Sequence, residues 1–600
     1  MLASLPPVSS AAKPAPPAAE PVPRFDPPGP GAWSLDTSHF PQPATRFVME
    51  LFTAPARRGF KEATARYGLL MDHIEWGFVH RWAYLCPRPV RALSDGMTHK
   101  GWDELVGSDA LLRGRLASSA TVFADRRWHE DVTRWDRRTK PQLSREHREL
   151  QAVQPMRLQS TELLSHLSRC RRNLQRAIYE HHCLNVAPVI PVGDFLVHAQ
   201  EWTGLPVADL VGLVRDARPL ASAAGTELTR LAQAMHDDPA AEELLASGDE
   251  TGAGGSGSEG VLASLRSWPG DLGRAAADYL DLVGCWSAGS GSDVGEPCLV
   301  EMPNLLVGTI RAAGPGGPRS AELTAGAALA AVAELAAERR AQVPPSSRDA
   351  FDALLAEARA THRLRDERAA YCDVWAHGLM RRAILAAGRR LTEGGIVEAP
   401  EHLVEATDAE LRSLIEGAPG PSGEELAARA RYRLTARQDD VPAGLGSPPP
   451  APVPIEWLAP GVARTERAFR TYLRAMSGEE VAASTHAIAG VGVSPGTHTG
   501  RARIVRSVAD LSRIEPGDVL VTGSTTPALN PVLPLIGAIV TDRGGLLSHA
   551  AIVAREFGIP AVVGTGDGTA KIPDGALVLV DGTAGQATVL DPQKDSNRSR

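Results

Sequence analysis

The stretch that most restricts the fold of this chain is TDRGGLLSHAAIVAREFGIPAVVGT, at residues 541–565. Its residue types predict a strand, a glycine turn, a helix and a second strand. Gly544 and Gly545 allow a tight turn and a close approach of the backbone to a bound group. His549 then falls in the first helical turn, which places its reactive side chain beside the glycine turn.

The predicted helix runs over residues 548–557, because Gly558 and Pro560 are strong stop signals. The free N–H groups and positive dipole end of a helix start favour an anion. A neutral imidazole at that place suits a nucleophile that accepts a phosphoryl group. The alternative is a histidine that merely lies near a helix start.

Short β-rich runs surround this stretch and are separated by Gly, Pro and Asp. They predict a compact β/α domain of about a hundred residues, near the common domain size. The runs lie at 501–505, 518–522, 537–541, 560–564, 576–582 and 587–590.

Upstream, the periodicity of apolar residues is helical. Residues 158–182 place apolar side chains three and four apart, and residues 321–342 are rich in Ala, Leu and Glu. Ser346 and Asp349 resemble a capping box that opens a long helix reaching about Arg390. The chain is therefore expected to be multidomain, with a large, mostly α-helical domain before the small β/α domain.

Composition shifts set the expected boundaries. A Gly/Ser run at 247–260 predicts a mobile loop inside the helical region. The expected parts are a disordered Pro/Ala-rich tail at 1–31, the helical substrate-binding domain at 32–443, a Pro-rich linker and connecting helix at 444–486, the β/α domain at 487–592 and a disordered tail at 593–600.

The pattern GG-x-x-SHAAI-x-ARE-x-GIPAVVG within 541–565 resembles the phosphohistidine signature of the phosphoenolpyruvate-utilising enzyme family. Residues 490–505, 520–534 and 574–590 resemble the same swivelling domain. The resemblance implies a swivelling β/β/α fold in which His549 accepts the phosphoryl group, Gly544 and Gly545 form the turn, and Ser548 bonds the phosphoryl group or orients the ring. Arg555 then either contacts phosphate or holds the helix through a salt bridge.

Residues 363–415 resemble the segment that precedes the swivelling domain in rifampin phosphotransferase-like proteins, whose helical domain binds the acceptor. Arg365 and Arg368 lie three apart and are predicted to share a helical face that attracts phosphate; a solvated or salt-bridged face is the alternative. Residues 279–303 depart from the family, because Cys285 and Trp286 follow Gly284 where relatives often read Gly-His-Arg. Glu301 is a candidate general base there, with a surface or capping carboxylate as the alternative.

Residues 72–84 carry His73, Trp76, His80, Arg81 and Tyr84 at spacings interpreted as helical. His80 and Arg81 are therefore candidates for a pocket wall, and a core aromatic stripe is the alternative. We expect no metal site, since His181 and His182 are adjacent and a helix would point them in different directions.

The net charge of −8 offers no basic surface for nucleic acid or an anionic membrane, and no run of eighteen uncharged apolar residues predicts a membrane helix. Six cysteines without CxxC spacing favour reduced thiols. The N-terminus lacks the pattern of a signal peptide. A cytoplasmic protein with no nucleic-acid or membrane partner is expected.

No segment resembles an ATP-grasp domain or a phosphate loop, and the residues after the last strand leave no room for a phosphoenolpyruvate-binding barrel. The first hypothesis is a phosphotransferase in which a separate ATP-grasp subunit, using ATP and magnesium, loads His549, which passes the phosphoryl group to a small hydroxylated substrate. The second is a phosphate-independent dehydratase or lyase of secondary metabolism that uses His549 as general acid/base. The third hypothesis is a non-catalytic binding protein. Under both enzyme hypotheses, we expect this chain itself to bind no cofactor.

Overall fold

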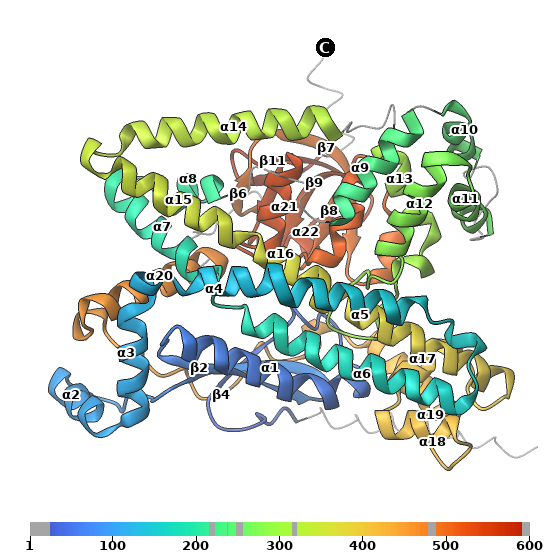
Figure 1. Cartoon of the computed structure of the whole chain (residues 1–600), viewed down its shortest axis with the longest axis horizontal. Coiled ribbons are helices and arrows are strands. Elements are labelled where there is room, and N and C mark those ends of the chain that lie inside the picture. Colours follow the sequence, from blue (N-terminus) through green and yellow to red (C-terminus); the bar gives the residue numbers. More distant parts are fainter. Residues whose placement is uncertain are drawn as a thin grey trace, which may run out of the picture.

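The computed structural model describes residues 24–214, 223–236, 238–247, 256–314, 321–477 and 488–590. The expected tails lie largely outside these ranges, as does most of the Gly/Ser run at 247–260. Figure 1 shows a small sheet domain, coloured orange to red, surrounded by long helices from the rest of the chain. The expected fold class is therefore confirmed: a large, mostly helical part is followed by a small C-terminal β/α domain.

The helical part is built from many helices of uneven length. Apart from the rod described below, its α-helices are α1 (Arg46–Arg66), α2 (His99–Ser108), α3 (Ala110–Asp125), α4 (Arg127–Arg134), α5 (Lys140–Ala152), α6 (Ser160–Cys183), α7 (Val189–Thr203), α8 (Val207–Leu210), α9 (Ala223–His236), α10 (Pro239–Ser247), α11 (Ser256–Arg266), α12 (Gly270–Val283), α13 (Pro303–Ala313), α14 (Ala321–Gln342), α18 (Asp408–Ile415), α19 (Gly423–Thr435) and α20 (Pro460–Ser477). Helices α6 and α14 agree with the two helices predicted from periodicity.

The long helix predicted to reach Arg390 is a segmented rod. It consists of α15 (Arg348–His362), α16 (Leu364–Arg368), a π-helical stretch (Ala369–Val374) and α17 (Trp375–Glu393). The predicted capping box is wrong, because Ser347 is the residue before the helix and its side chain makes no capping hydrogen bond. Stretches of π-helix insert an extra residue per turn and are frequent at functional sites.

The helical interpretation of residues 72–84 is also wrong. These residues form most of a hairpin, β2 (Met71–Val79) and β3 (Trp82–Pro89), in a four-stranded antiparallel sheet. The sheet order is β2-β3-β1-β4, with β1 at Ala32–Leu35 and β4 at Gly444–Gly446. The run is rich in aromatic and β-branched residues, whose strand preference outweighs a helical spacing of histidines. The start of the expected Pro-rich linker is thus a strand paired with β1.

Helix α20, in the segment predicted as linker and connecting helix, packs closely on α7. A Cβ atom at Gly193 of α7 would lie 1.9 Å from the carbonyl oxygen of Ala468 in α20. The two helix backbones approach this closely because neither side chain at the crossing is larger than a methyl group.

Gly193→Ala is expected to destabilise the protein by about 3 kcal/mol, because the added methyl group forces two buried backbones apart. Gly260→Ala in α11 is the matched control: no atom lies within 4 Å of its added Cβ, and the change is expected to be neutral or stabilising by up to about 1 kcal/mol. Denaturant unfolding of both variants measures this difference. Equal midpoints would contradict the close packing of α7 on α20.

The C-terminal domain contains one eight-stranded mixed sheet in the order β5-β12-β11-β7-β8-β9-β10-β6. Strands β7 to β10 are parallel neighbours, and the outer strands are antiparallel. The predicted strands and the predicted helix are present as β7 (Thr497–Val505), β8 (Asp518–Thr522), β9 (Ile536–Thr541), α21 (His549–Phe557), β10 (Ala561–Val563), β11 (Leu577–Asp581) and β12 (Gln586–Val589). The structure adds β5 (Ile488–Ala489), β6 (Val491–Ser494) and the short helix α22 (Gly568–Lys571).

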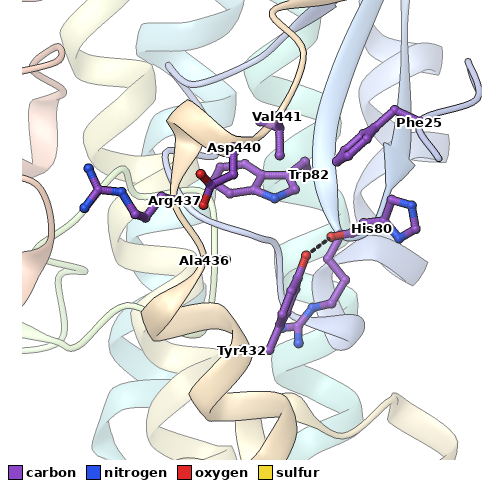
Figure 2. Close-up of a pocket in the computed structure, with 9 residues that line it drawn as sticks. Phe25, His80, Trp82, Tyr432, Ala436, Arg437, Asp440 and Val441 are labelled. Atoms are coloured by element: carbon purple, nitrogen blue, oxygen red, sulfur yellow. Dashed lines mark hydrogen bonds between the residues drawn. The ribbon is translucent and has the colours of Figure 1, made fainter. Parts of the chain in front are cut away.

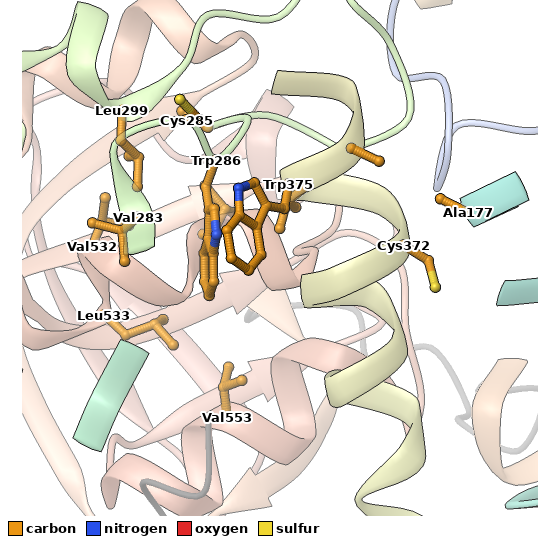
Figure 3. Packing of buried hydrophobic residues seen from close by; sticks show 14 of the residues in the cluster. Ala177, Val283, Cys285, Trp286, Leu299, Cys372, Trp375, Val532, Leu533 and Val553 are labelled. Carbon is orange, nitrogen blue, oxygen red and sulfur yellow. The ribbon is translucent and has the colours of Figure 1, made fainter. Parts of the chain in front are cut away.

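The two parts of the molecule meet through a buried apolar interface. Trp286, Trp375 of α17, and Leu533 and Val553 of the C-terminal domain all belong to one buried apolar cluster (Figure 3). Thr526 also donates a hydrogen bond of 2.7 Å to the carbonyl oxygen of Gly289. The structure therefore shows the C-terminal domain docked on the helical part, with the Cys285–Trp286 departure inside the contact.

Candidate phosphohistidine site

The glycine turn and the start of α21 fix the position of His549. Ser548 is the N-cap residue of α21, and its hydroxyl accepts a hydrogen bond of 3.3 Å from the backbone N–H of Ala551. Gly544 has a φ of +123°, and a Cβ atom there would lie 2.8 Å from the Ser548 hydroxyl. Only glycine fits this turn, so the sequence GG-x-x-SH places the imidazole at the helix start.

Both ring nitrogens of His549 have partners in the C-terminal domain. Nδ1 lies 2.9 Å from the hydroxyl of Thr525, and Nε2 lies 3.0 Å from Oδ1 of Asn530. With this amide orientation, Nε2–H donates to Asn530 and the Thr525 hydroxyl donates to Nδ1. Sequence reasoning missed both residues. The available signal was topological: β8 and β9 are parallel neighbours, so the loops that follow them lie at the same edge of the sheet.

His549 is held as a neutral imidazole. Burial lowers its pKa to about 3, with a further contribution from the positive charge of Arg365. The ring is 5% exposed. A neutral ring is the form that attacks phosphorus, so the site meets the first requirement for a phosphoryl acceptor.

Arg365 and Arg368 point to different parts of the protein. The Arg365 guanidinium donates to the carbonyl oxygen of Leu547, next to the N-cap of α21. The Arg368 guanidinium donates to the Asn185 side chain and, at 3.2 Å, to the carbonyl oxygen of His181. Among the described residues, neither arginine forms a salt bridge with a carboxylate. Of the two, Arg365 reaches the C-terminal domain and Arg368 bonds within the helical part.

Arg555 makes local contacts to backbone carbonyl groups. Its guanidinium donates to Val493 at 2.7 Å and to Leu546. These bonds tie α21 to β6 and to the glycine turn, which is the holding role that the resemblance offered as one of two alternatives.

Glu301 is engaged structurally. Both of its carboxylate oxygens accept hydrogen bonds of 2.8 Å from Arg381, and one also accepts from the Cys298 backbone N–H at 2.9 Å. Hydrogen bonds and charge from Arg381 outweigh burial and lower the pKa of Glu301. A carboxylate with a lowered pKa and fully used oxygens is a poor general base, so the capping alternative agrees with its contacts.

His80 and Arg81 lie in the β2–β3 turn, with φ values of +47° and +70°. They line a cavity of about 410 Å³ with Tyr432, whose hydroxyl donates to the carbonyl oxygen of His80 at 2.8 Å (Figure 2). Arg81 donates to the buried Glu405 and to the carbonyl oxygen of Ala44. No residue of the C-terminal domain lines this cavity, so the structure does not bring His80 and Arg81 to His549.

The fold and the site combine a large helical part with a small sheet domain that is docked on it and carries a histidine at a helix start. Residues 514–585 match the family model of the PEP-utilising enzyme mobile domain, and residues 198–366 match that of the rifampicin phosphotransferase fourth domain. The resemblance to the phosphoenolpyruvate-utilising enzymes is thereby confirmed.

Similar proteins share only part of this chain. It is 34% identical over 248 residues to chondramide synthase cmdD of Chondromyces crocatus, covering 40% of this chain and 6% of that protein. It is 32% identical over 246 residues to the uncharacterised phosphotransferase YvkC of Bacillus subtilis, covering 41% and 28%. A 99-residue match to phosphoenolpyruvate synthase of Aeropyrum pernix is 54% identical, covering 16% and 12%. The chain thus spans less than a third of each of these relatives.

Two of these relatives are named as a phosphotransferase and a phosphoenolpyruvate synthase. Among the described residues, no helix is both long enough and apolar enough to cross a membrane.

Proposed function

We propose that this protein is a phosphotransferase in which His549 relays a phosphoryl group to a small hydroxylated substrate held by the helical domain. The observation that carries the proposal is the buried, neutral His549 at the start of α21, beside a glycine turn that only glycine fits. A separate ATP-grasp subunit, with ATP and magnesium, supplies the phosphoryl group.

The reaction has two displacement steps. In the first, a nitrogen of His549 attacks phosphorus on the donor, and the P–O bond to the leaving group breaks as the N–P bond forms. In the second, the substrate hydroxyl oxygen attacks phosphorus, the N–P bond breaks, and the hydroxyl proton passes to a base. Helix-start N–H groups and the nearby Arg365 charge stabilise the phosphoryl oxygens in the docked state.

In this proposal the docked arrangement is one end of the relay. His549 has both nitrogens hydrogen-bonded and little exposed surface, so a large donor protein has no access to it here. Loading therefore requires the C-terminal domain to leave the helical part, and transfer requires it to return.

Purified protein incubated with phosphate-labelled ATP and candidate ATP-grasp proteins tests this function. We expect an acid-labile, alkali-stable label on His549 that appears only when the partner is present. His498→Asn, which changes the other described histidine of the C-terminal domain, is expected to keep the label. No label on His549 with any partner would exclude the relay.

An elimination catalysed by His549 as general acid/base is the second candidate. Two observations favour it: one match is to a chondramide synthase, and the buried Trp286 stands where the family resemblance calls for a charged pair. It requires turnover in the absence of nucleotide, which His549→Ala abolishes. Unchanged turnover in that variant would exclude a catalytic histidine.

A further inference from the structure

A group of buried and half-buried ionisable side chains lies in the helical domain beside the docked C-terminal domain. Its members come from the segment after β1, the end of α6, and the rod formed by α16, the π-helical stretch and α17. We call it the Asp373 cluster; it consists of Asp36, His39, His181, His182, Arg368, Asp373 and His377.

The cluster contains two aspartate–histidine pairs. His39 Nδ1 lies 2.8 Å from Oδ2 of Asp36, which also accepts a hydrogen bond of 3.0 Å from the indole N–H of Trp76. His181 Nδ1 lies 2.8 Å from Oδ2 of Asp373. Nδ1 of His181 forms no hydrogen bond in this arrangement, so the nearby Asp373 carboxylate acts on the ring through its charge, which favours the protonated imidazole.

The second pair has the open nitrogen that a base requires. Nε2 of His181 has no hydrogen-bond partner among the described residues, and the side chains of His181 and Asp373 are 11% and 20% exposed. His377, also in the cluster, is 1% exposed, and its Nε2 has no partner within the described part of the chain. Asp373 belongs to the π-helical stretch, a distortion common at functional sites.

Each carboxyl group of the cluster has an opposing basic group nearby. Burial raises the pKa of Asp373 to about 6, against the opposing charges of His377, His182, Arg368 and His39. Burial, with Arg368, His39 and His377 as further causes, keeps the pKa of His181 well below its usual value. Burial opposes ionisation of Asp36 and His39, yet their mutual attraction prevails, lowering the pKa of Asp36 and raising that of His39.

In the cluster, Asp36 is therefore paired with His39, and Asp373 is opposed by Arg368. Asp293 also acts on His377 from the neighbouring loop. Because each carboxyl group of the cluster has an opposing partner, the cluster offers little attraction for an ionised acceptor.

Contacts connect this cluster to His549. Thr525, a partner of His549, precedes Thr526, which bonds Gly289. Two residues further along that loop, a Cβ atom at Gly291 would lie 3.6 Å from Cβ of Asp373. On the other side, the charge of Asp36 acts on Arg543 in the turn that precedes His549. Both loops that surround His549 thus face the cluster.

We propose that the His181–Asp373 pair is the general base of the acceptor site, and that the acceptor is a neutral molecule bearing a hydroxyl group. This inference rests on the phosphotransfer proposed above. As the acceptor oxygen bonds to phosphorus and the N–P bond of His549 breaks, Nε2 of His181 takes the hydroxyl proton. Asp373 is the positioning residue, because its carboxylate lies 2.8 Å from Nδ1 and stabilises the imidazolium that forms.

The test uses the full chain loaded with phosphoramidate, a small phosphoryl donor that needs no partner subunit. Decay of phospho-His549 and formation of a phosphorylated product are followed with glycerol as the neutral probe and glycerate as the anionic probe. We expect transfer to glycerol and a loss of about 10²-fold in its rate in His181→Gln and Asp373→Asn. The wild-type rate is expected to fall below pH 6, with this inflection absent in Asp373→Asn and restored in Asp373→Glu.

His166→Gln is the matched control, since His166 is a buried histidine of the same helix α6 outside the cluster. It is expected to transfer at the wild-type rate, and equal circular dichroism spectra show that each variant is folded. Wild-type rates in both cluster variants would overturn the assigned base while leaving the relay intact. The assigned base would also be overturned if phospho-His549 decayed no faster in the wild type than in the unfolded chain. Faster transfer to glycerate than to glycerol would overturn the neutral acceptor. Failure to load His549 would instead contradict the phosphotransfer itself.

Discussion

A His549→Asn variant is expected to lose phosphoryl acceptance completely and yet to unfold about as readily as the wild type. The amide of asparagine is not a nucleophile, so removing the imidazole removes the covalent step and at least about 10⁴-fold in transfer rate. The asparagine still offers a polar group to the Thr525 hydroxyl. Loss of the remaining ring contacts costs about 1 kcal/mol, the usual size for a single substitution.

The measurement pairs a labelling assay with denaturant unfolding of the same preparation. His498→Asn is the control, because the hydrogen bond of this histidine is to the carbonyl oxygen of Gly517, at 2.8 Å, in the turn before β8 and not to His549 or its partners. It should keep both labelling and stability. Retained labelling in His549→Asn would show that another residue accepts the phosphoryl group. A large loss of stability in this variant would show that His549 has a structural role instead.

Local patterns predicted the C-terminal domain well. Its predicted strands are β-branched runs bounded by Gly, Pro or Asp, and α21 has a capping serine at its start and a glycine at its end. Short-range preferences and tertiary structure therefore agree in this domain. The same agreement placed His549 at a helix start before any contact was known. In the helical part, residues 72–84 failed this test, because histidine spacing is a weaker signal than the strand preference of their aromatic neighbours.

The partners of His549 and the Asp373 cluster were beyond sequence reasoning for a different reason. Thr525 and Asn530 meet the ring only because β8 and β9 pair in parallel, and the cluster joins residues separated by more than 300 positions. Such contacts depend on topology, which local sequence patterns do not give. His181 and His182 are an example: their rings lie 4.8 Å apart, although successive helical residues point in different directions.

Burial of neutral histidines makes the stability of this protein sensitive to acid. Burial is the largest cause that lowers the pKa of His147, His362 and His549 to about 3, and that of His166 to about 4. Their unfolded forms have the ordinary pKa of about 6.5. Between these values the unfolded chain binds more protons, so stability is intact above pH 6.5 and falls as the pH drops toward 3.

Each of these histidines is expected to remove about 1.4 kcal/mol of stability between pH 7.5 and 5.5, or roughly 5 kcal/mol for the four together. The raised pKa of Asp373, about 6, acts in the opposite direction because the folded form of that carboxyl keeps its proton. The contribution of one histidine to the loss of stability is therefore measured by comparing variants. In His147→Leu, the loss of stability over this interval should be smaller than in the wild type by about 1.4 kcal/mol. His99→Asn changes a histidine whose side chain is 55% exposed, and its unfolding should follow the wild-type pH dependence. Identical pH dependence in His147→Leu and the wild type would show that His147 is protonated in the folded protein, which its buried position beside Trp375 opposes.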